Sequence, residues 1–88
     1  MLDERHILSD LEFVEMVVWL LDCPLPQSSH NYKYRLALVV NGKCVLRYDN
    51  EAGKGDHKHA GDAEMAYSFS TPQMLLDDFW EDVSKWRI

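Results

Sequence analysis

The sequence predicts an α+β domain in which a small antiparallel sheet of four to five strands is packed by one C-terminal helix. Its 88 residues, 47% of them hydrophobic, suit a single domain, residues 1–88, with a thin core. Asn41-Gly42 lies between two strand-like runs, which is the strongest short-range signal of a β-hairpin. After Pro72, apolar residues recur every three or four positions, which is the period of a helix that buries one face.

The N-terminal part of the chain predicts two strands. Residues 4–8 are weakly strand-like, and Ser9-Asp10 suits a turn. Residues 11–21 are rich in valine and aromatic residues, which favours a strand. Both alternating sets of this segment are mostly apolar, so we expect a central strand that is covered on both faces. A helix over residues 11–21 stays open as an alternative, because periodicity does not separate the two.

The Asn41-Gly42 turn fixes an expected register for the strands at residues 32–40 and 43–49, because a two-residue turn sets which residues face each other. On one face the expected pairs are Val40–Lys43, Leu38–Val45, Leu36–Arg47 and Tyr34–Asp49. On the other face they are Val39–Cys44, Ala37–Leu46 and Arg35–Tyr48. One helix cannot cover both faces of a sheet. The uncovered face is therefore a candidate surface for self-association or for a partner.

The last third of the chain predicts turns, a short strand and the helix. Three glycines fall within residues 50–61, where turns are expected, and a short strand is expected at 66–69. Thr71 is a candidate N-cap, and Pro72 suits the first helical position. The apolar stripe that we expect to pack on the sheet consists of Leu75, Leu76, Phe79, Val83 and Trp86.

The formal charge of −6 conceals an uneven distribution. Residues 1–30 carry one base and six acids, a net of −5, and residues 59–88 carry two bases and six acids, a net of −4. Residues 31–58 carry six bases and three acids, a net of +3. The total argues against a generic nucleic-acid binder, but the basic centre can hold a local positive field.

Several classes of protein are excluded by simple features. The longest apolar run, Met16 to Leu21, is six residues, whereas a membrane span needs roughly 18–20. The N-terminus has two acids before its first base, unlike a secretory signal. Cys23 and Cys44 form no CxxC pair, and we interpret them as reduced packing residues. These features predict a cytoplasmic protein with no membrane contact.

The chemically richest segment is residues 48–59, where three interpretations compete. In the first, His57 and His59 hold a divalent metal ion, with Asp49, Glu51 or Asp56 as a third ligand. A bare HxH spacing is a weak signal of such a site. In the second interpretation, Gly-rich turns and histidines bonded to the backbone have only a structural role.

The third interpretation is metal-free cleavage of RNA, without any cofactor. This reaction needs a base, an acid and positive charge on the phosphate, and histidine suits proton transfer near neutral pH. The cationic side chains of Lys54 and Arg47 are suited to binding the negatively charged phosphate. The backbone of Gly53-Lys54-Gly55 is a candidate anion nest, although it lacks the spacing of a P-loop.

Three runs of the sequence carry a resemblance to a known family. They are Tyr32-Lys33-Tyr34-Arg35-Leu36, the YDNE run at residues 48–51 and the GKGDHKH run at residues 53–59. Over nearly the whole chain, the sequence resembles the TumE-like toxins of bacterial toxin–antitoxin systems. The resemblance implies a toxin that is neutralised by a helix-turn-helix type antitoxin encoded beside it.

The resemblance does not define the molecular activity. Small toxins with one sheet and one helix are often ribonucleases, and extending that activity to this chain is an analogy from the class. On that hypothesis His57 and His59 transfer protons. Lys54 and Arg47 hold phosphate, and Asp49 or Tyr48 orients the histidines. The alternatives are a non-enzymatic binding module, for instance a homodimer formed through the uncovered sheet face, and a metal-dependent hydrolase that uses the two histidines.

Overall fold

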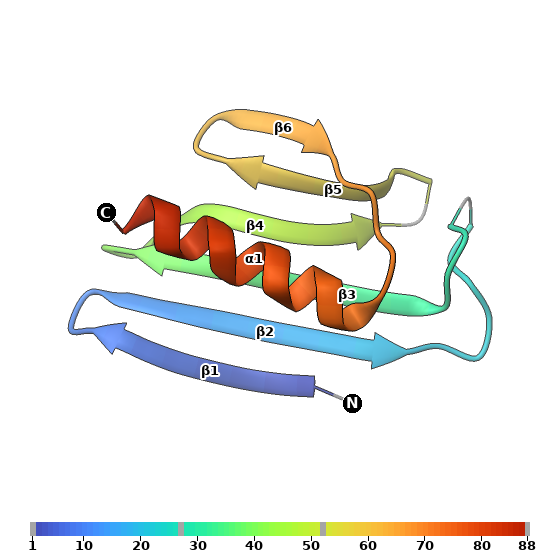
Figure 1. The fold of residues 1–88 in the computed structure, drawn as a ribbon, viewed down its shortest axis with the longest axis horizontal. Coiled ribbons are helices and arrows are strands. Elements are labelled where there is room, and N and C mark those ends of the chain that lie inside the picture. The colour runs from blue at the N-terminus through green and yellow to red at the C-terminus, as the bar shows by residue number, and fades with distance from the viewer. Residues whose placement is uncertain (1, 27, 52, 88) are drawn as a thin grey trace.

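The computed structural model describes residues 2–26, 28–51 and 53–87. Over these residues the chain forms one antiparallel sheet whose six strands follow each other in sequence order, and then one helix (Figure 1). The elements are β1 (Leu2–Ser9), β2 (Glu12–Leu20), β3 (Tyr32–Val40), β4 (Lys43–Glu51), β5 (Gly55–Ala60), β6 (Ala63–Ala66) and α1 (Pro72–Trp86). The α+β class is confirmed, but the sheet has six strands where four to five were predicted.

The second strand confirms one prediction and corrects another. Residues 12–20 are extended, so the helical alternative is wrong. Val14, Met16 and Val18 are buried on the face that α1 covers, whereas the residues between them are only half-buried. The expectation that both faces would be covered is therefore wrong, because α1 lies across one face of the sheet (Figure 1). We call the opposite face the open face.

The β3–β4 hairpin contains a β-bulge that changes the expected register. Its turn is as predicted, with φ of 53° at Asn41 and 75° at Gly42. Val39 pairs with Cys44, but Leu38 then pairs with Leu46, so that Val45 is the extra residue of the bulge. Beyond this point every predicted pair is off by one residue.

The bulge has a clear physical reason. An unbroken ladder would have placed Arg47 and Asp49 beside Leu36 and Tyr34, under the helix, where burying charge is costly. With the bulge, Leu36 pairs with Tyr48, and Arg35 pairs with Asp49. Arg47 and Asp49 consequently lie on the open face, and Leu46 and Tyr48 lie under α1.

The end of the sheet also differs from the prediction. The strand expected at residues 66–69 lies at Ala63–Ala66, because a tight turn with Gly61 at φ 61° brings the chain back directly after β5. The backbone N–H of Tyr67 donates to the carbonyl of Asp56, 3.1 Å away, and closes this hairpin. Cys23 and Cys44, expected to pack, are free and exposed.

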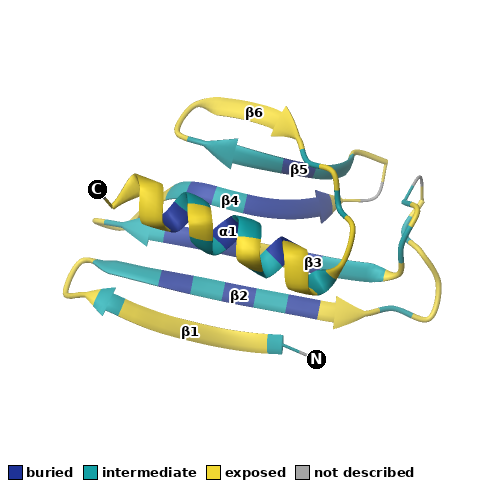
Figure 2. Cartoon of the chain, viewed as in Figure 1, coloured by how far each residue is buried: buried dark blue, intermediate teal, exposed yellow. Residues whose placement is uncertain are grey.

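The core lies between α1 and strands β2, β3 and β4. Leu75, Phe79 and Val83 are its buried helical residues, as the predicted stripe requires, whereas Trp86 is 45% exposed. Burial is concentrated on the middle strands and on one side of α1, and β1 and β6 are largely exposed (Figure 2). No helix in the described part of the chain is long and apolar enough to cross a membrane.

Replacing the helix cap should destabilise the domain measurably. Thr71 is the N-cap, and its hydroxyl accepts a hydrogen bond of 3.1 Å from the N–H of Met74. We expect Thr71→Ala to lower the free energy of unfolding by about 1 kcal/mol, as measured by urea denaturation. Thr71→Ser retains the acceptor and should stay close to the parent. Equal stability of the alanine variant would contradict this role of the cap.

Candidate functional site

The open face carries two neighbouring rows of side chains, each crossing all six strands. The register of the five strand pairs defines them. The first row consists of Arg5, Glu15, Ala37, Arg47, His59 and Glu64. The second row consists of Asp3, Val17, Arg35, Asp49, His57 and Ala66. Both histidines therefore lie on one face, where the alternation of β5 also predicts them.

The centre of these rows is the group Asp49, His57 and His59. His57 Nε2 lies 2.6 Å from Asp49 Oδ1, and the two side chains are only 6% and 9% exposed. The rings of His57 and His59 meet edge to face, with their centroids 5.1 Å apart. One ligand-type atom from each of the three residues lies within 4.8 Å of the other two. We call this group the Asp49–His centre.

The surroundings of the centre fix its orientation. His57 Nδ1 lies 3.1 Å from the carbonyl oxygen of Gly55, which can accept its proton and leave Nε2 directed at Asp49. Arg47 Nε lies 3.1 Å from Asp49 Oδ2, while a third of the Arg47 side chain stays exposed. The carboxylate is thus held between a guanidinium and an imidazole.

Lys54 lies at the edge of the centre, on the turn between β4 and β5. Its Nζ is 3.4 Å from Glu64, whose other carboxylate oxygen is 3.9 Å from His59 Nδ1. The charge of Lys54 is the main cause that lowers the pKa of Glu64 below its usual value. A hollow of about 390 Å³ adjoins these groups. Its lining residues are Lys54, Asp56, His57, Glu64, Met65 and Ala66.

The predicted anion nest is not free to bind an anion. Gly53 and Gly55 do have positive φ values of 83° and 77°, as the turn requires. However, the N–H of Gly53 donates to the Pro26 carbonyl at 3.2 Å, and that of Lys54 donates to Glu51 at 3.1 Å. Two of the three donors of the nest are therefore used within the protein, which corrects this prediction.

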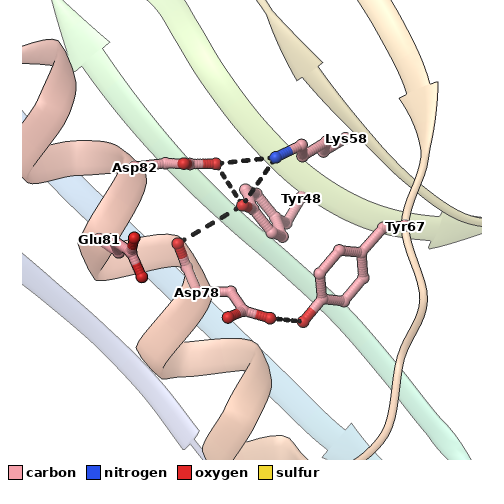
Figure 3. A pocket seen from close by; sticks show the side chains of 6 residues that line it. All are labelled: Tyr48, Lys58, Tyr67, Asp78, Glu81 and Asp82. Atoms are coloured by element: carbon pink, nitrogen blue, oxygen red, sulfur yellow. Dashed lines mark hydrogen bonds and ion pairs between the residues drawn. The ribbon is translucent and has the colours of Figure 1, made fainter.

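Tyr48 lies on the other side of the sheet from the histidines, under α1. Its hydroxyl donates to Asp82 and lies 3.5 Å from Lys58, in a polar pocket between helix and sheet (Figure 3). Burial, and then the hydrogen bond to Asp82, raise the pKa of the Tyr48 phenol. In the same pocket Tyr67 donates to Asp78 at 2.6 Å. The structure does not bring Tyr48 to the histidines, and these polar contacts instead fasten α1 to the sheet.

The other two carboxylates considered as metal ligands lie apart from the centre. Asp56 accepts from the Tyr34 hydroxyl at 2.7 Å and lies 2.8 Å from His30 Nε2. Burial, and then this hydrogen bond to Asp56, raise the pKa of the Tyr34 phenol. Glu51 is exposed at the end of β4. Of the three candidates, only Asp49 joins the two histidines.

A comparison with protein families matches residues 2–87 to the family described as "Toxin TumE". The chain belongs to this toxin family. No curated protein and no solved structure matches it. The YDNE and GKGDHKH runs of this TumE family member correspond to β4, the following turn and β5, and thus supply all three residues of the Asp49–His centre.

One residue near the centre was not predicted from the sequence. Arg35 is the exposed cross-strand partner of Asp49 and belongs to the same row of the open face. The unbroken register had paired it with Tyr48 instead. The signal that could have found it is the run Leu46-Arg47-Tyr48-Asp49, whose apolar members must share the face of Leu36 and Leu38. That requirement demands a bulge between the turn and Leu46.

Proposed function

We propose that this toxin is a metal-independent ribonuclease whose reaction takes place at the Asp49–His centre on the open face. The observation that carries the proposal is the buried carboxylate–imidazole pair of Asp49 and His57 with a second imidazole, His59, against it. Two imidazoles near one carboxylate are the groups that proton transfer at neutral pH requires.

The proposed reaction is transfer of the RNA phosphodiester to its own 2′-oxygen. One imidazole removes the proton of the 2′-hydroxyl while that oxygen bonds to phosphorus. The bond from phosphorus to the 5′-oxygen breaks, and the other imidazole gives that oxygen a proton. The products are a 2′,3′-cyclic phosphate and a free 5′-hydroxyl, so atoms and charges balance. Asp49 stabilises the imidazolium of His57, which forms in the course of the reaction.

Cations around the centre suit the charge of the substrate. Arg35 is the cross-strand partner of Asp49 in the second row, and Arg47 is the partner of Ala37 in the first row. Lys54 lies on the turn between β4 and β5. Guanidinium groups bind phosphate oxygens with paired donors. This local field supports binding of an anionic polymer in spite of the total charge of −6.

The open face also carries aromatic and apolar side chains that suit the bases of a single-stranded nucleic acid. Phe13, Val17 and Trp19 of β2 alternate with the buried residues of that strand, and Trp19 is 50% exposed. Aromatic side chains beside cationic ones are the usual means of binding single-stranded RNA, because bases stack on them. Lys33 is the cross-strand neighbour of Trp19, and its ammonium group donates to the carbonyl of Asn50.

Purified toxin incubated with a defined single-stranded RNA tests the proposed function. We expect fragments that end in a 2′,3′-cyclic phosphate, formed equally well in the presence of EDTA. The same sequence with 2′-deoxyribose throughout is the matched control and should stay intact. If the toxin arrests growth when it is expressed but the purified toxin leaves the RNA intact, the ribonuclease assignment is rejected.

Substituting Trp19 tests the assignment of the open face as the RNA-binding surface. We expect Trp19→Ala to weaken binding of single-stranded RNA by about 5- to 150-fold, the equivalent of about 1–3 kcal/mol of stacking. Fluorescence anisotropy with labelled RNA measures the effect. Trp86→Ala is the control, since Trp86 is 45% exposed but belongs to α1 on the opposite face. Equal loss of affinity in both variants would contradict the assignment.

A binding role of the open face is the second candidate function. Ile7 is 69% exposed on β1 and lies on the same face as Trp19. Apolar side chains in this position suit a protein partner, either a helix-turn-helix antitoxin that neutralises the toxin by covering the centre, or a second copy of the chain. Size measurement at micromolar concentration separates these two, because a clean monomer is incompatible with the homodimer.

A further inference from the structure

We propose that the Asp49–His centre also binds a divalent metal ion of the zinc class, and that the bound ion switches off RNA cleavage. Binding of the ion stands on the geometry of the centre alone. Its inhibitory effect rests on the proposed ribonuclease function, and the two parts are tested separately below.

The first argument comes from buried polar atoms without partners. Within the described residues, the buried side-chain atoms that lack a hydrogen-bond partner are Arg47 Nε, Asp49 Oδ1, His57 Nε2 and His59 Nε2. Although His57 Nε2 and Asp49 Oδ1 are 2.6 Å apart, their contact is not aligned as a hydrogen bond. Arg47 Nε and His57 Nε2 each face a carboxylate oxygen of Asp49 as ion pairs, at 3.1 and 2.6 Å. His59 Nε2 is the buried atom of this group that has neither a hydrogen bond nor an ion pair, and buried polar atoms are rarely left without partners.

The second argument is the chemical type of these atoms. Three of the four carry lone pairs: the carboxylate oxygen of Asp49 and the Nε2 atoms of the two histidines in the tautomer that protonates Nδ1. His57 Nδ1 faces the Gly55 carbonyl at 3.1 Å, which favours that tautomer. A carboxylate oxygen and two imidazole nitrogens within 4.8 Å of one another are a donor set that a divalent cation can bind in place of a proton.

The third argument is that outer contacts already orient two of the three donors, those of His57 and Asp49. Ligating histidines in metal sites usually donate their other N–H to a carbonyl or a carboxylate, and ligating carboxylates are hydrogen-bonded in turn. Here His57 Nδ1 has the Gly55 carbonyl 3.1 Å away, whereas the Glu64 carboxylate lies 3.9 Å from His59 Nδ1, beyond hydrogen-bond distance. Asp49 Oδ2 has Arg47 Nε 3.1 Å away, so Oδ1, which faces His57 Nε2 at 2.6 Å, is the oxygen directed at the proposed ion.

The donor set selects the kind of ion. Two imidazoles and one carboxylate suit zinc and its neighbours in the transition series, whereas magnesium and calcium prefer oxygen ligands alone. One donor atom from each residue lies within 4.8 Å of the others, and bonds of about 2.0–2.2 Å require side-chain movements on the order of 1 Å. Three protein ligands leave a fourth position for water.

Metal binding and proton transfer exclude each other at this centre. A lone pair that is bonded to zinc can neither accept the proton of a 2′-hydroxyl nor carry one to the leaving oxygen. In the proposed reaction the Nε2 atoms of the two imidazoles would serve both purposes, so a zinc-loaded toxin lacks its base and its acid. The open-face centre then has an active metal-free state and an inactive zinc state.

Binding is tested on the full chain, purified without a histidine tag and freed of metal by dialysis against a chelator. We expect uptake of one zinc ion per chain in competition with a chromophoric chelator, and no uptake of magnesium at the same concentration. His59→Ala and Asp49→Asn should each weaken zinc binding by about 10- to 100-fold. His6→Ala is the matched control, because His6 lies on the opposite face and pairs with Glu4.

Cobalt provides a second measurement that does not depend on the folding of any variant. Cobalt(II) added to the parent chain should give visible absorption bands of a four- or five-coordinate site, and zinc should abolish them. Absence of stoichiometric zinc uptake, or uptake that all three variants retain equally, would overturn the metal site.

Inhibition is measured by RNA cleavage with increasing zinc. We expect the cleavage rate to fall with the same midpoint as zinc binding and to return when EDTA is added. Cleavage that zinc leaves unchanged would overturn the switch, and cleavage that requires zinc would replace it with a metal-dependent hydrolase. Zinc binding by a chain that cleaves no RNA would reject the ribonuclease function while the metal site stands.

Discussion

His59→Ala should abolish the growth inhibition that expression of the toxin causes. General acid–base catalysis by one positioned imidazole contributes about 10²–10⁴-fold to a reaction rate, so its loss leaves too little activity to arrest a culture. His59 is better suited to this test than His57, because its side chain is 25% exposed and that of His57 only 6%. The measurement is culture density after induction from a regulated promoter.

The control for this prediction is another histidine of the same chain. His6 lies on β1 beside Glu4 and Trp80, on the face covered by α1, so His6→Ala should stay as toxic as the parent. Protein levels must be equal in all cultures, because an unstable variant is also harmless. If His59→Ala inhibits growth as strongly as His6→Ala does, His59 has no catalytic role.

Phe79→Ala should have the largest effect on stability of any single truncation in α1. The Phe79 ring is fully buried between the helix and the sheet and meets Tyr48 edge to face, with centroids 5.7 Å apart. We expect a loss of about 3–5 kcal/mol in the free energy of unfolding, from lost burial and the cavity left behind. A domain of this size has about 4–13 kcal/mol in total, so the variant should be partly unfolded at 37 °C.

Urea denaturation followed by tryptophan fluorescence measures this loss. Met74→Ala is the control on the same helix, because Met74 is 46% exposed and should change stability by less than about 0.5 kcal/mol. A loss below about 1 kcal/mol for Phe79→Ala would contradict the position of the core. Phe79→Ala and His59→Ala also separate two causes of lost toxicity. Phe79→Ala should lose toxicity because it unfolds, whereas His59→Ala should lose toxicity although it is folded.

The order of elements was predictable in part, where local signals were strong, but β5 was missed because its segment was expected to form turns. Asn41-Gly42 defined a hairpin, and Thr71-Pro72 with the apolar stripe defined the start and the buried face of α1. The weak strands at the ends of the sheet gave less signal. The residues of β1 and β6 are almost all exposed, so no alternation of apolar residues identifies them, and β6 was expected three residues too late.

The composition of the site was predictable, but its neighbours were not. His57 and His59 at alternate positions of a strand must share a face, and Asp49 on the preceding strand was a candidate partner. The bulge at Val45, however, decides that Asp49 and Arg47 join them on the open face while Tyr48 goes to the core. The bulge results from the packing of the whole sheet, and no single residue of the hairpin predicts it.

The most direct test of the Asp49–His centre is the rate constant for RNA cleavage by purified Asp49→Asn under single-turnover conditions. Asparagine keeps the shape of the carboxylate but removes the charge that stabilises the His57 imidazolium. Circular dichroism and urea denaturation establish that the variant is folded. We predict that folded Asp49→Asn cleaves RNA about 100-fold more slowly than the parent. A rate within about twofold of the parent would contradict catalysis at this centre.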